Sequence, residues 1–576
     1  MAAKRPKSGA NGDTPHPEMP LPERELVVVA EPSAGLRATA TEVASAAGAD
    51  TTRINKLLAD ENIALQPLFG PSEERLAAEA TALRSRAAVE VPDLSVFYRV
   101  RAEDSRLEDL AKSLASLPGI VTAYVKPAAE PPVGPRSAEA TLEREEAVEA
   151  APPATPDFTS RQGYLNAAPE GVDAVYAATV PGGRGAGSRI IDIEGAWNFS
   201  HEDLLQNQGG VVGGTPTNDI DWRNHGTSVV GEFGADLNGF GVTGISPDAN
   251  VRAISIFGGV GSASAIHQAA NLLSPGDIIL IELHRPGPRH SFQSRQDQRG
   301  YIALEWWPDD YAAIRYATNL GVTVVEAAGN GAENLDDALY DTPAAGFPTS
   351  WRNPFNPANP SSLAVVAGAG APPPGTHGRN HGPDRSRLDF SNYGRRVDAQ
   401  GWGREVTTTG GGGLQGGADE NVWYTDTFSG TSSASPIVVG SLGSIQGILR
   451  AAGQTVLTPA QAINVLRQTG SPQQDAPGRP ATQRIGNRPD IRGAIALLVQ
   501  TAVQSGIATQ YWDEEVAYPP GTASSLWLYV NNDWRKRDTS SPHDRTMVQR
   551  AFQNSGNQVR VWYQGTEIVG LVVNGS

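Results

Sequence analysis

Four serines lie in the stretch FSGTSSASP, residues 428–436, and one of them has partners that could make it a nucleophile. A serine hydroxyl is weakly nucleophilic and needs an adjacent base. Upstream, DWRNHG places His225 just before a predicted helix, and RIIDIEG places Asp192 at the end of a predicted strand. An imidazole can take the hydroxyl proton and return it to a leaving amine, while a buried carboxylate fixes the imidazole tautomer. The three fragments predict a catalytic triad of Asp192, His225 and Ser432.

A fourth fragment, VVEAAGNG, places Asn330 after another predicted strand. Its side-chain amide could donate to the oxyanion that forms when a carbonyl carbon is attacked. Ser432 stands at the start of a predicted helix, where free backbone N–H groups and the helix dipole also favour negative charge. These residues together are suited to acyl transfer from a peptide or ester carbonyl.

Alternating strands and helices must hold these residues in place. The apolar runs within 158–503 are nearly continuous in Val, Ile and Ala, which is typical of parallel strands covered on both faces. The sequence predicts strands at 189–193, 251–257, 277–283, 322–329 and 363–370, and helices at 226–235, 264–273 and 309–320. This alternation predicts an α/β fold with a doubly wound, mostly parallel sheet, whose strand ends form a crevice.

The remaining segments differ in composition. Residues 1–22 are polar and Pro-rich and are interpreted as a disordered lead, and 23–126 as a small α+β domain. Residues 127–157 are rich in Pro and Glu, which indicates a solvated linker. Residues 504–576 contain four of the eleven tryptophans and are predicted to form a small β-rich module with a helix near 542–553.

The sequence resembles the subtilisin-like serine protease family, the subtilases, over about 158–455. DIEGAWNFSHEDL resembles the family's Asp motif, NHGTSVVGEFGADLNGFGVTGISPDANV its His motif, VVEAAGN its oxyanion motif and FSGTSSASP its Ser motif. The order Asp, His, Ser is also that of subtilisin. The resemblance implies catalytic roles for Asp192, His225 and Ser432 and an oxyanion role for Asn330. The other three serines of the last motif are then structural.

The resemblance also implies where a substrate binds. The family pairs its substrate with a strand that here reads IELHRPG, so Glu282, Leu283, His284 and Arg285 are expected to line the specificity pocket in place of small residues. FGGVG, with Gly258 and Gly259, is expected to form the opposite edge of the cleft. Pairing through backbone groups stays available whatever the side chains are.

Two further expectations come from the resemblance. Asp203 and Asn238 match positions that hold a structural calcium ion in many family members, and their oxygens suit that ion, although a loop without metal is an equal alternative. The unit at 23–126 resembles the family's propeptide. We therefore expect a zymogen that processes itself within 127–157 and whose N-terminal domain acts as an intramolecular inhibitor.

Composition narrows the function classes. The net charge of -17 argues against nucleic acid as a partner, and the absence of cysteine excludes thiolate chemistry. No apolar run is long enough for a membrane span, and the first twenty residues lack the apolar core of a secretion signal. The compartment stays open, cytoplasmic by default or exported by another route.

The expected function is hydrolysis of peptide bonds in peptides or proteins by a serine endopeptidase that requires no cofactor for its chemistry. Two alternatives stay open: a peptide-binding pseudoenzyme, and an acyl-transfer enzyme that ligates or cyclises peptides on the same fold.

Overall fold

The computed structural model describes residues 20–70, 72–86, 91–133, 154–499, 504–514, 525–538, 542–554, 557–564 and 567–574. Two compact units contain them, Met1–Ile495 and Ala496–Ser576. The boundary between the units therefore lies eight residues before the start of the predicted module at 504. None of the helices within these ranges is long and apolar enough to cross a membrane.

The first part of the larger unit is an antiparallel sheet with helices, as predicted. The strand order is β4-β5-β1-β6. The strands are β1 (Glu25–Ala30), β4 (Leu65–Pro67), β5 (Phe97–Val100) and β6 (Ile120–Lys126), and the helices are α1 (Thr52–Glu61), α2 (Glu73–Arg86) and α3 (Leu107–Ala115). Leu26 and Val28 of β1 point into this domain's own core, whereas Val27 and Val29 join the core of the segment that follows. The period of two along β1 thus lets one strand serve two cores.

The second part is the doubly wound α/β fold. Its seven strands are all parallel, in the order β15-β14-β13-β10-β7-β9-β8. They are β7 (Arg189–Glu194), β8 (Gln208–Gly213), β9 (Asn250–Ser255), β10 (Ile278–Ile281), β13 (Thr323–Ala327), β14 (Val365–Gly370) and β15 (Ala399–Trp402). The central strands are buried along their whole length, as their unbroken Val and Ile content predicts.

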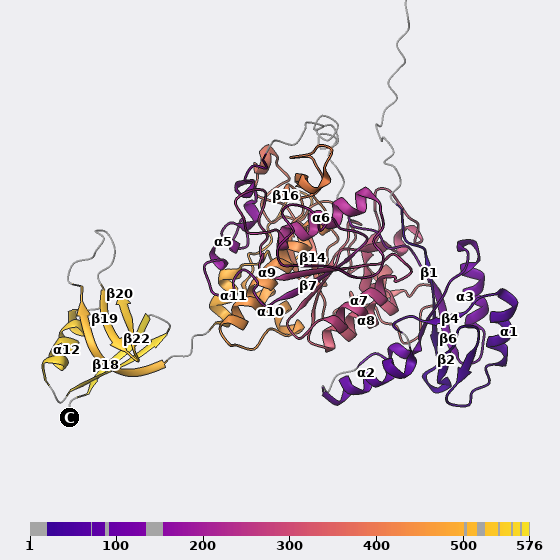
Figure 1. Cartoon of the computed structure of the whole chain (residues 1–576), viewed down its shortest axis with the longest axis horizontal. Coiled ribbons are helices and arrows are strands. Elements are labelled where there is room, and N and C mark those ends of the chain that lie inside the picture. Colours follow the sequence, from indigo (N-terminus) through magenta and orange to yellow (C-terminus); the bar gives the residue numbers. More distant parts are fainter. Residues whose placement is uncertain are drawn as a thin grey trace, which may run out of the picture. The chain divides into compact units, whose positions relative to one another are not determined.

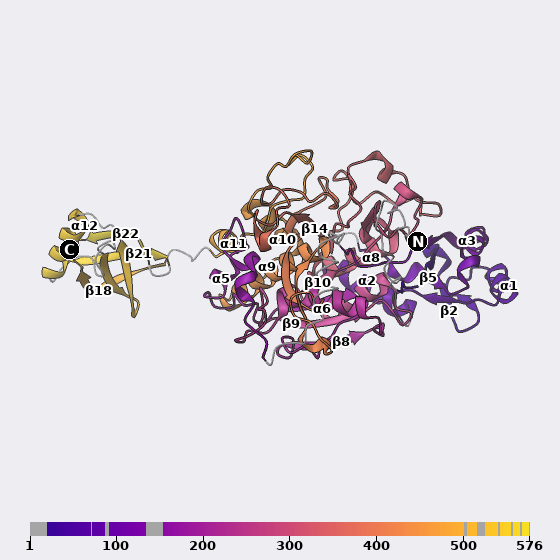
Figure 2. The ribbon, with the colours of Figure 1, turned by 90° about the horizontal axis from the view of Figure 1, so that it is seen from above.

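Helices cover both faces of this sheet (Figures 1 and 2). The main ones are α6 (Ile220–Gly234), α7 (Ser262–Leu272), α8 (Pro308–Asn319), α9 (Thr431–Ala451), α10 (Pro459–Thr469) and α11 (Ile491–Leu498). The α6 and α9 helices pack against each other, and so do α7 and α8. Trp306 and Trp307, just before α8, are buried in the core.

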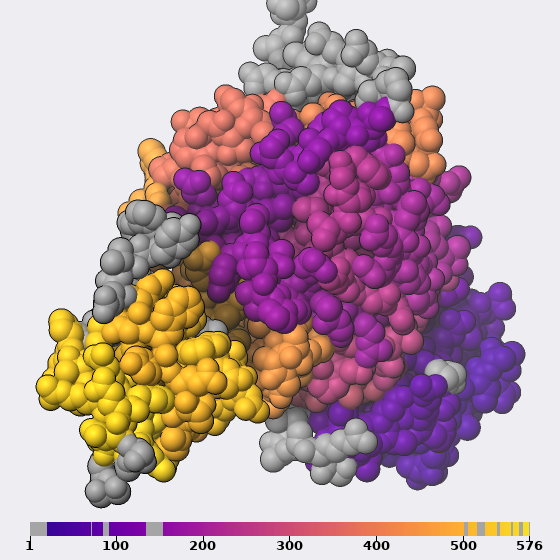
Figure 3. All heavy atoms as spheres, turned by 60° about the vertical axis from the view of Figure 1, so that its left-hand side comes forward, coloured from indigo at the N-terminus to yellow at the C-terminus, as the bar shows by residue number. Residues whose placement is uncertain are grey.

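The N-terminal sheet lies against α7 and α8, and Figure 3 shows its indigo residues in contact with the magenta and pink residues of the α/β fold. Phe69 packs edge-on against His267 of α7, with ring centroids 5.7 Å apart. Lys126, at the end of β6, is fully buried and forms ion pairs with Asp309 and, at 3.3 Å, with Asp310 at the start of α8. These contacts direct the chain beyond β6 towards the carboxyl ends of the parallel strands.

The smaller unit is a closed barrel with the strand order β18-β19-β20-β22-β21. Its elements are β18 (Gln504–Asp513), β19 (Ser525–Val530), β20 (Asp533–Asp538), α12 (Pro542–Gln553), β21 (Gln558–Gln564) and β22 (Glu567–Asn574). The third and fifth strands, β20 and β22, are parallel, and the helix lies between the third and fourth strands. This is the topology of an OB-fold. The predicted helix near 542–553 is confirmed as α12.

Candidate active site

Ser432 and His225 meet at the N-terminal ends of two packed helices. Ser432 is the second residue of α9, and Gly430 before it has a φ of 121°, which a residue with a side chain rarely adopts. His225 lies in the second turn of α6. Its Nε2 is 2.9 Å from Ser432 Oγ. Both side chains are buried, so the base and the nucleophile are held together away from bulk water.

The carboxylate beside His225 belongs to Glu194 and not to Asp192. Glu194 Oε1 lies 2.6 Å from His225 Nδ1. Asp192 instead accepts a hydrogen bond from the indole N–H of Trp197, at 2.7 Å. In this geometry Glu194, and not the expected Asp192, is the carboxyl group that hydrogen-bonds His225.

The length of β7 explains why Glu194, and not Asp192, reaches His225. The strand runs to Glu194, one residue beyond the predicted end, so Glu194 and Asp192 share one face. Glu194 lies about 6.6 Å further along the strand, towards the carboxyl end where the helices begin. The period of two along the strand marks both acidic residues as candidates, but it does not choose between them.

Several buried carboxyl groups surround this site. Burial raises the pKa of Glu194 well above its usual value, and that of Asp192 as well, where the nearby charge of Glu194 adds to the effect. Glu282 and Glu232 are fully buried too, and burial raises the pKa of each. Burial lowers the pKa of His225 to about 4, although the charge of Asp192 opposes that shift. The imidazole is therefore neutral, as a general base must be.

Asn330 is oriented by its neighbours. Its Oδ1 accepts hydrogen bonds from the backbone N–H of Thr431, at 2.9 Å, and from the Thr431 hydroxyl, at 3.0 Å. Because both donors need the oxygen, the Nδ2 group must point the other way, where it lies 3.4 Å from Gln298 Oε1. Asn330 is buried and contacts Thr431, the residue before Ser432.

The segment after β6 enters this site as an extended chain. Glu130 and His284 pair as an antiparallel bridge, with N–H to O distances of 3.1 and 3.0 Å. Two residues on, the carbonyl oxygen of Pro132 lies 2.8 Å from Ser432 Oγ. A hydroxyl has one proton, so Ser432 donates either to Pro132 or to His225, and the second arrangement is the one that precedes attack. Residues 127–133 of the predicted solvated linker are therefore held in the site; residues 134–153 lie outside the described part of the chain.

The Glu130 side chain is enclosed. It is 8% exposed, and its Oε1 accepts a hydrogen bond of 2.5 Å from the Tyr301 hydroxyl. The amide of Gln298 donates to the Pro131 carbonyl at 2.9 Å and lies 3.4 Å from Glu130 Oε2. Ala129 is also buried, in the same core as the helices below it. The cleft thus holds Ala129 and then Glu130, followed by Pro131 and Pro132.

The residues expected to line the specificity pocket have separate positions. His284 pairs with the bound segment through its backbone, while its Nδ1 lies 3.3 Å from the backbone N of Asn330. Leu283 is part of the core, and Glu282 Oε1 accepts a 2.5 Å hydrogen bond from Ser435. Arg285 contacts the carbonyl oxygen of Pro127, five residues before Pro132, and donates to Ser262 at 2.6 Å. Arg285 therefore contacts the chain entering the cleft and not the residue next to the nucleophile.

Of Gly258 and Gly259, the residues expected at the opposite edge of the cleft, Gly259 is contacted by the N-terminal domain. Both have positive φ angles, 72° and 78°. The carbonyl oxygen of Gly259 accepts hydrogen bonds from Arg99 of β5 and, at 2.9 Å, from Arg101. This edge is therefore occupied by side chains and not by a substrate strand.

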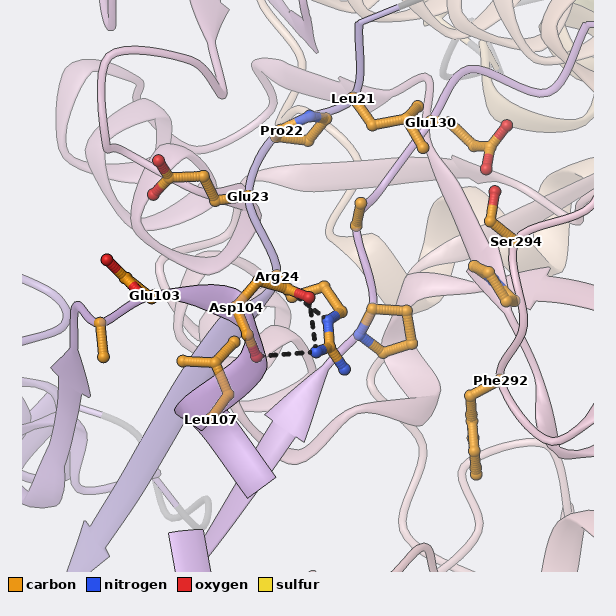
Figure 4. Close-up of a pocket in the computed structure, with 14 residues that line it drawn as sticks. Leu21, Pro22, Glu23, Arg24, Glu103, Asp104, Leu107, Glu130, Phe292 and Ser294 are labelled. Carbon is orange, nitrogen blue, oxygen red and sulfur yellow. Dashed lines mark hydrogen bonds and ion pairs between the residues drawn. The ribbon is translucent and has the colours of Figure 1, made fainter. Parts of the chain in front are cut away.

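A cavity of about 510 Å³ borders the bound segment (Figure 4). Leu21 and Pro22 line it on one side, and Phe292 and Ser294 on the other. The residue before Leu21, Pro20, accepts a hydrogen bond of 2.8 Å from the indole of Trp222 in α6. The last residues of the predicted lead are thus ordered against the α/β fold beside the cleft.

The donor set at Asp203 and Asn238 does not fit a calcium ion. The two side chains lie together, but the Asn238 amide donates to Asp203 Oδ1 at 2.6 Å. The other oxygen accepts from the backbone N–H of Val242 at 2.7 Å. Burial raises the pKa of Asp203 to about 7, and both of its oxygens already accept hydrogen bonds from protein groups, whereas Ca²⁺ needs several oxygens turned towards it. Within the described ranges, no cluster of three His, Cys, Asp or Glu side chains could hold a metal ion.

Comparison with known proteins identifies the family of the chain. The model of the subtilase family matches residues 191–487. An intracellular serine protease of Paenibacillus polymyxa is 26% identical over 352 residues, which cover 59% of this chain and 87% of that protein. Subtilisin NAT of Bacillus subtilis subsp. natto is 25% identical over 283 residues, 48% of this chain and 61% of that protein.

A solved structure, the epidermin leader peptide processing serine protease of Staphylococcus aureus, aligns with a TM-score of 0.47 and 19% identity, covering 84% of this chain and all of that one. The family match extends over more than half of the chain and includes the strand of Glu194, the helix of His225 and Ser432. The reaction of this family requires no cofactor, and its substrates are peptides or proteins. The chain therefore belongs to the subtilase family and is a serine-type endopeptidase.

Proposed function

We propose that this endopeptidase acts through a triad of Ser432, His225 and Glu194. Ser432 Oγ attacks the carbonyl carbon of the substrate while His225 Nε2 takes its proton. His225 then gives this proton to the leaving amine, and water hydrolyses the acyl-enzyme by the same route. Glu194 Oε1 accepts the Nδ1–H hydrogen bond and so fixes the tautomer, and the positive charge that forms on the imidazole favours the ionised carboxylate that stabilises it. The observation that carries the proposal is the unbroken chain from Glu194 through His225 to Ser432, at 2.6 and 2.9 Å.

The oxyanion is stabilised by the amide of Asn330 and by backbone N–H groups at the start of α9. The two hydrogen bonds from Thr431 support this role, because they fix Oδ1 as the acceptor, and the Nδ2 group, which also donates to Gln298 Oε1, keeps a second proton that an oxyanion could accept. A preorganised donor of this kind acts most strongly where water is excluded.

The enzyme is made as a zymogen, and its N-terminal domain is an intramolecular inhibitor. Support comes from the ion pairs of Lys126, the arginine contacts to Gly259 and the bridge between Glu130 and His284, all of which fix the segment 127–133 in the cleft. The bond to be cut is then Pro132–Val133, because the Pro132 carbonyl is the one at Ser432. Intramolecular cleavage of this bond is independent of protein concentration.

The same contacts define a substrate preference. Counting back from the cleaved bond, Ala129 is the fourth residue and Glu130 the third, and both are buried. Tyr301 and Gln298 supply hydrogen-bond donors for the acidic side chain. The preferred substrates are extended peptides with a small residue four positions and a glutamate three positions before the cleaved bond.

The test is to purify the wild-type chain and the Ser432→Ala chain and to determine the N-terminal sequences of their products. The wild type should give a fragment that begins at Val133, and Ser432→Ala should remain a folded chain of 60.6 kDa. A peptide library should then show enrichment of Ala at the fourth and Glu at the third position.

Two results would contradict separate parts of the proposal. Cleavage of pure Ser432→Ala at the same bond would exclude Ser432 as the nucleophile. A wild-type chain that stays intact while it hydrolyses added peptides would leave the triad standing and would make the N-terminal domain a permanent part of the enzyme.

A further inference from the structure

The C-terminal barrel carries a row of aromatic side chains on its outer face. In β19, Leu526, Leu528 and Val530 are buried, whereas Trp527 and Tyr529 point outwards and are half-buried. The neighbouring strands continue this face, because residues directly opposite each other in a sheet share a side. Trp512 of β18 lies opposite Trp527, and Trp534 of β20 lies opposite Tyr529. Figure 1 shows these three strands side by side in yellow.

The four aromatic side chains form two adjacent rows across three strands. One row is Trp512, Trp527 and Lys536, and the other is Gln510, Tyr529 and Trp534. The rings of Tyr529 and Trp534 are 5.3 Å apart, edge to face. Trp512 is 62% exposed, which is unusual for the largest apolar side chain. The core of the barrel does not need this residue, so its position calls for another explanation.

The position of the face within the barrel also points to a ligand. These are the first three strands of the barrel, and in OB-folds the face of strands two and three binds oligonucleotides or oligosaccharides. Topology alone does not assign a function. The additional observation here is the gathering of four aromatic rings on that face.

The charged residues on and near this face distinguish between an oligonucleotide and an oligosaccharide as the ligand. Arg535 pairs with Asp533 and stacks on Tyr563, with 4.6 Å from its guanidinium to the ring centroid. Arg537 lies 3.6 Å from Asp544 of α12. Of the six residues in the two rows, Lys536 alone carries a charge. A nucleic acid needs several cations for its phosphates, whereas a neutral sugar needs flat apolar rings with a few polar groups beside them.

We propose that the outer face of β18, β19 and β20 binds a neutral oligosaccharide. The flat faces of the sugar rings stack on Trp512, Trp527 and Trp534, and Gln510 provides hydrogen bonds to hydroxyl groups. The site is separate from the triad, and the proposal does not depend on the proposed mechanism. Its consequence is an endopeptidase that attaches itself to a glycan or a glycosylated surface.

The test uses the full-length chain carrying Ser432→Ala, which prevents self-digestion. Calorimetric titrations with cellohexaose, chitohexaose, xylohexaose and mannohexaose are compared with a titration of a thymidine dodecanucleotide. At least one hexasaccharide should bind, and Trp512→Ala or Trp527→Ala should weaken its binding by about tenfold or more. The matched control is Trp562→Ala, a tryptophan of β21 outside the two rows, which should leave the affinity unchanged.

Three results would overturn the proposal. One is the absence of binding by all four sugars at millimolar concentration. Another is equal weakening by Trp562→Ala, which would indicate a general loss of barrel structure. The third is binding of the dodecanucleotide alone with a strong dependence on salt, which would assign the face to nucleic acid.

Discussion

The cleft and the C-terminal barrel place their functional side chains in opposite environments. In the cleft, Glu194, His225 and Ser432 are all buried and joined by short hydrogen bonds. On the barrel, Trp512 is largely exposed and its neighbours project from a sheet whose core is complete without them. The difference follows from chemistry: charge stabilisation is strongest where water is excluded, whereas a stacking surface must be open to its ligand.

This contrast predicts how many properties of the protein a single substitution should change. Residues that share hydrogen bonds are coupled, so removing one changes the others. Exposed residues on a stable sheet act singly, and most substitutions there change stability little. Cleft variants are therefore expected to change several properties at once, and variants of the barrel face to change ligand binding alone.

The largest expected effect separates the two acidic residues of β7. Glu194→Gln should lower the rate of peptide hydrolysis about 10⁴-fold, the size seen when the carboxylate of a serine protease triad becomes an amide. Asp192→Asn keeps the acceptor for Trp197 and should lower the rate only a few-fold. The rates are measured with a fluorogenic peptide and active-site titration. If Asp192→Asn proved the more damaging change, Glu194 would lose its assigned role.

Asn330→Ala should lower the rate by about 10² to 10³, the loss known for the equivalent kind of donor in subtilisin. Self-processing should slow by a similar factor without stopping, because the triad is intact. Pulse-chase gels of the precursor measure the processing rate. Thr431→Val is an informative companion, since it removes one of the two donors that orient Asn330 and should give a smaller loss. An unchanged rate in Asn330→Ala would exclude it from the oxyanion site.

The pH dependence should differ between the covered and the open cleft. Burial lowers the pKa of His225 to about 4, so the imidazole stays neutral and active until the pH falls to about 4. An exposed histidine would already be half protonated near pH 6.5. Self-processing should therefore run at similar rates at about pH 5 and about pH 7, and the mature enzyme should lose activity at a higher pH than processing does. A processing rate that halves near pH 6.5 would contradict this expectation.

Glu130 and Tyr301 should show coupling within the cleft. Either Glu130→Gln or Tyr301→Phe should slow self-processing roughly tenfold, because a hydrogen bond to a charged group contributes about 1.5–3 kcal/mol. The double variant should be little slower than each single one. Processing time courses of the four proteins complete the cycle. Additive losses would mean that the 2.5 Å contact does not position the segment.

The smallest effect is expected on the barrel face. Trp512→Ala should leave both the melting temperature of the barrel and the peptidase rate unchanged, because its side chain is 62% exposed. Leu528→Ala in the same sheet should destabilise the barrel by about 2–5 kcal/mol, since Leu528 is fully buried. Calorimetry of the full chain provides both values. A large loss of stability in Trp512→Ala would remove the contrast between cleft and barrel.

The sequence alone determined the order of the α/β fold and three of the residues that meet at the candidate site. The Val- and Ile-rich runs predicted the parallel strands, and the fragments around His225, Asn330 and Ser432 predicted residues that the fold brings together. These features are local: a strand is recognised by its apolar run and a nucleophile by the helix start that follows it.

The tertiary structure alone decided which acidic residue faces His225. Asp192 and Glu194 share a face of β7, so the choice depends on where the strand ends relative to α6, and no local pattern contains that distance. Tertiary packing also decided the position of Arg285. The sequence placed Arg285 in the specificity pocket, whereas in the fold it contacts the carbonyl oxygen of Pro127. Pro132 reaches Ser432 across 300 positions of sequence because the N-terminal domain docks on α7 and α8. Such contacts depend on how separate elements pack, and packing is a property of the whole chain.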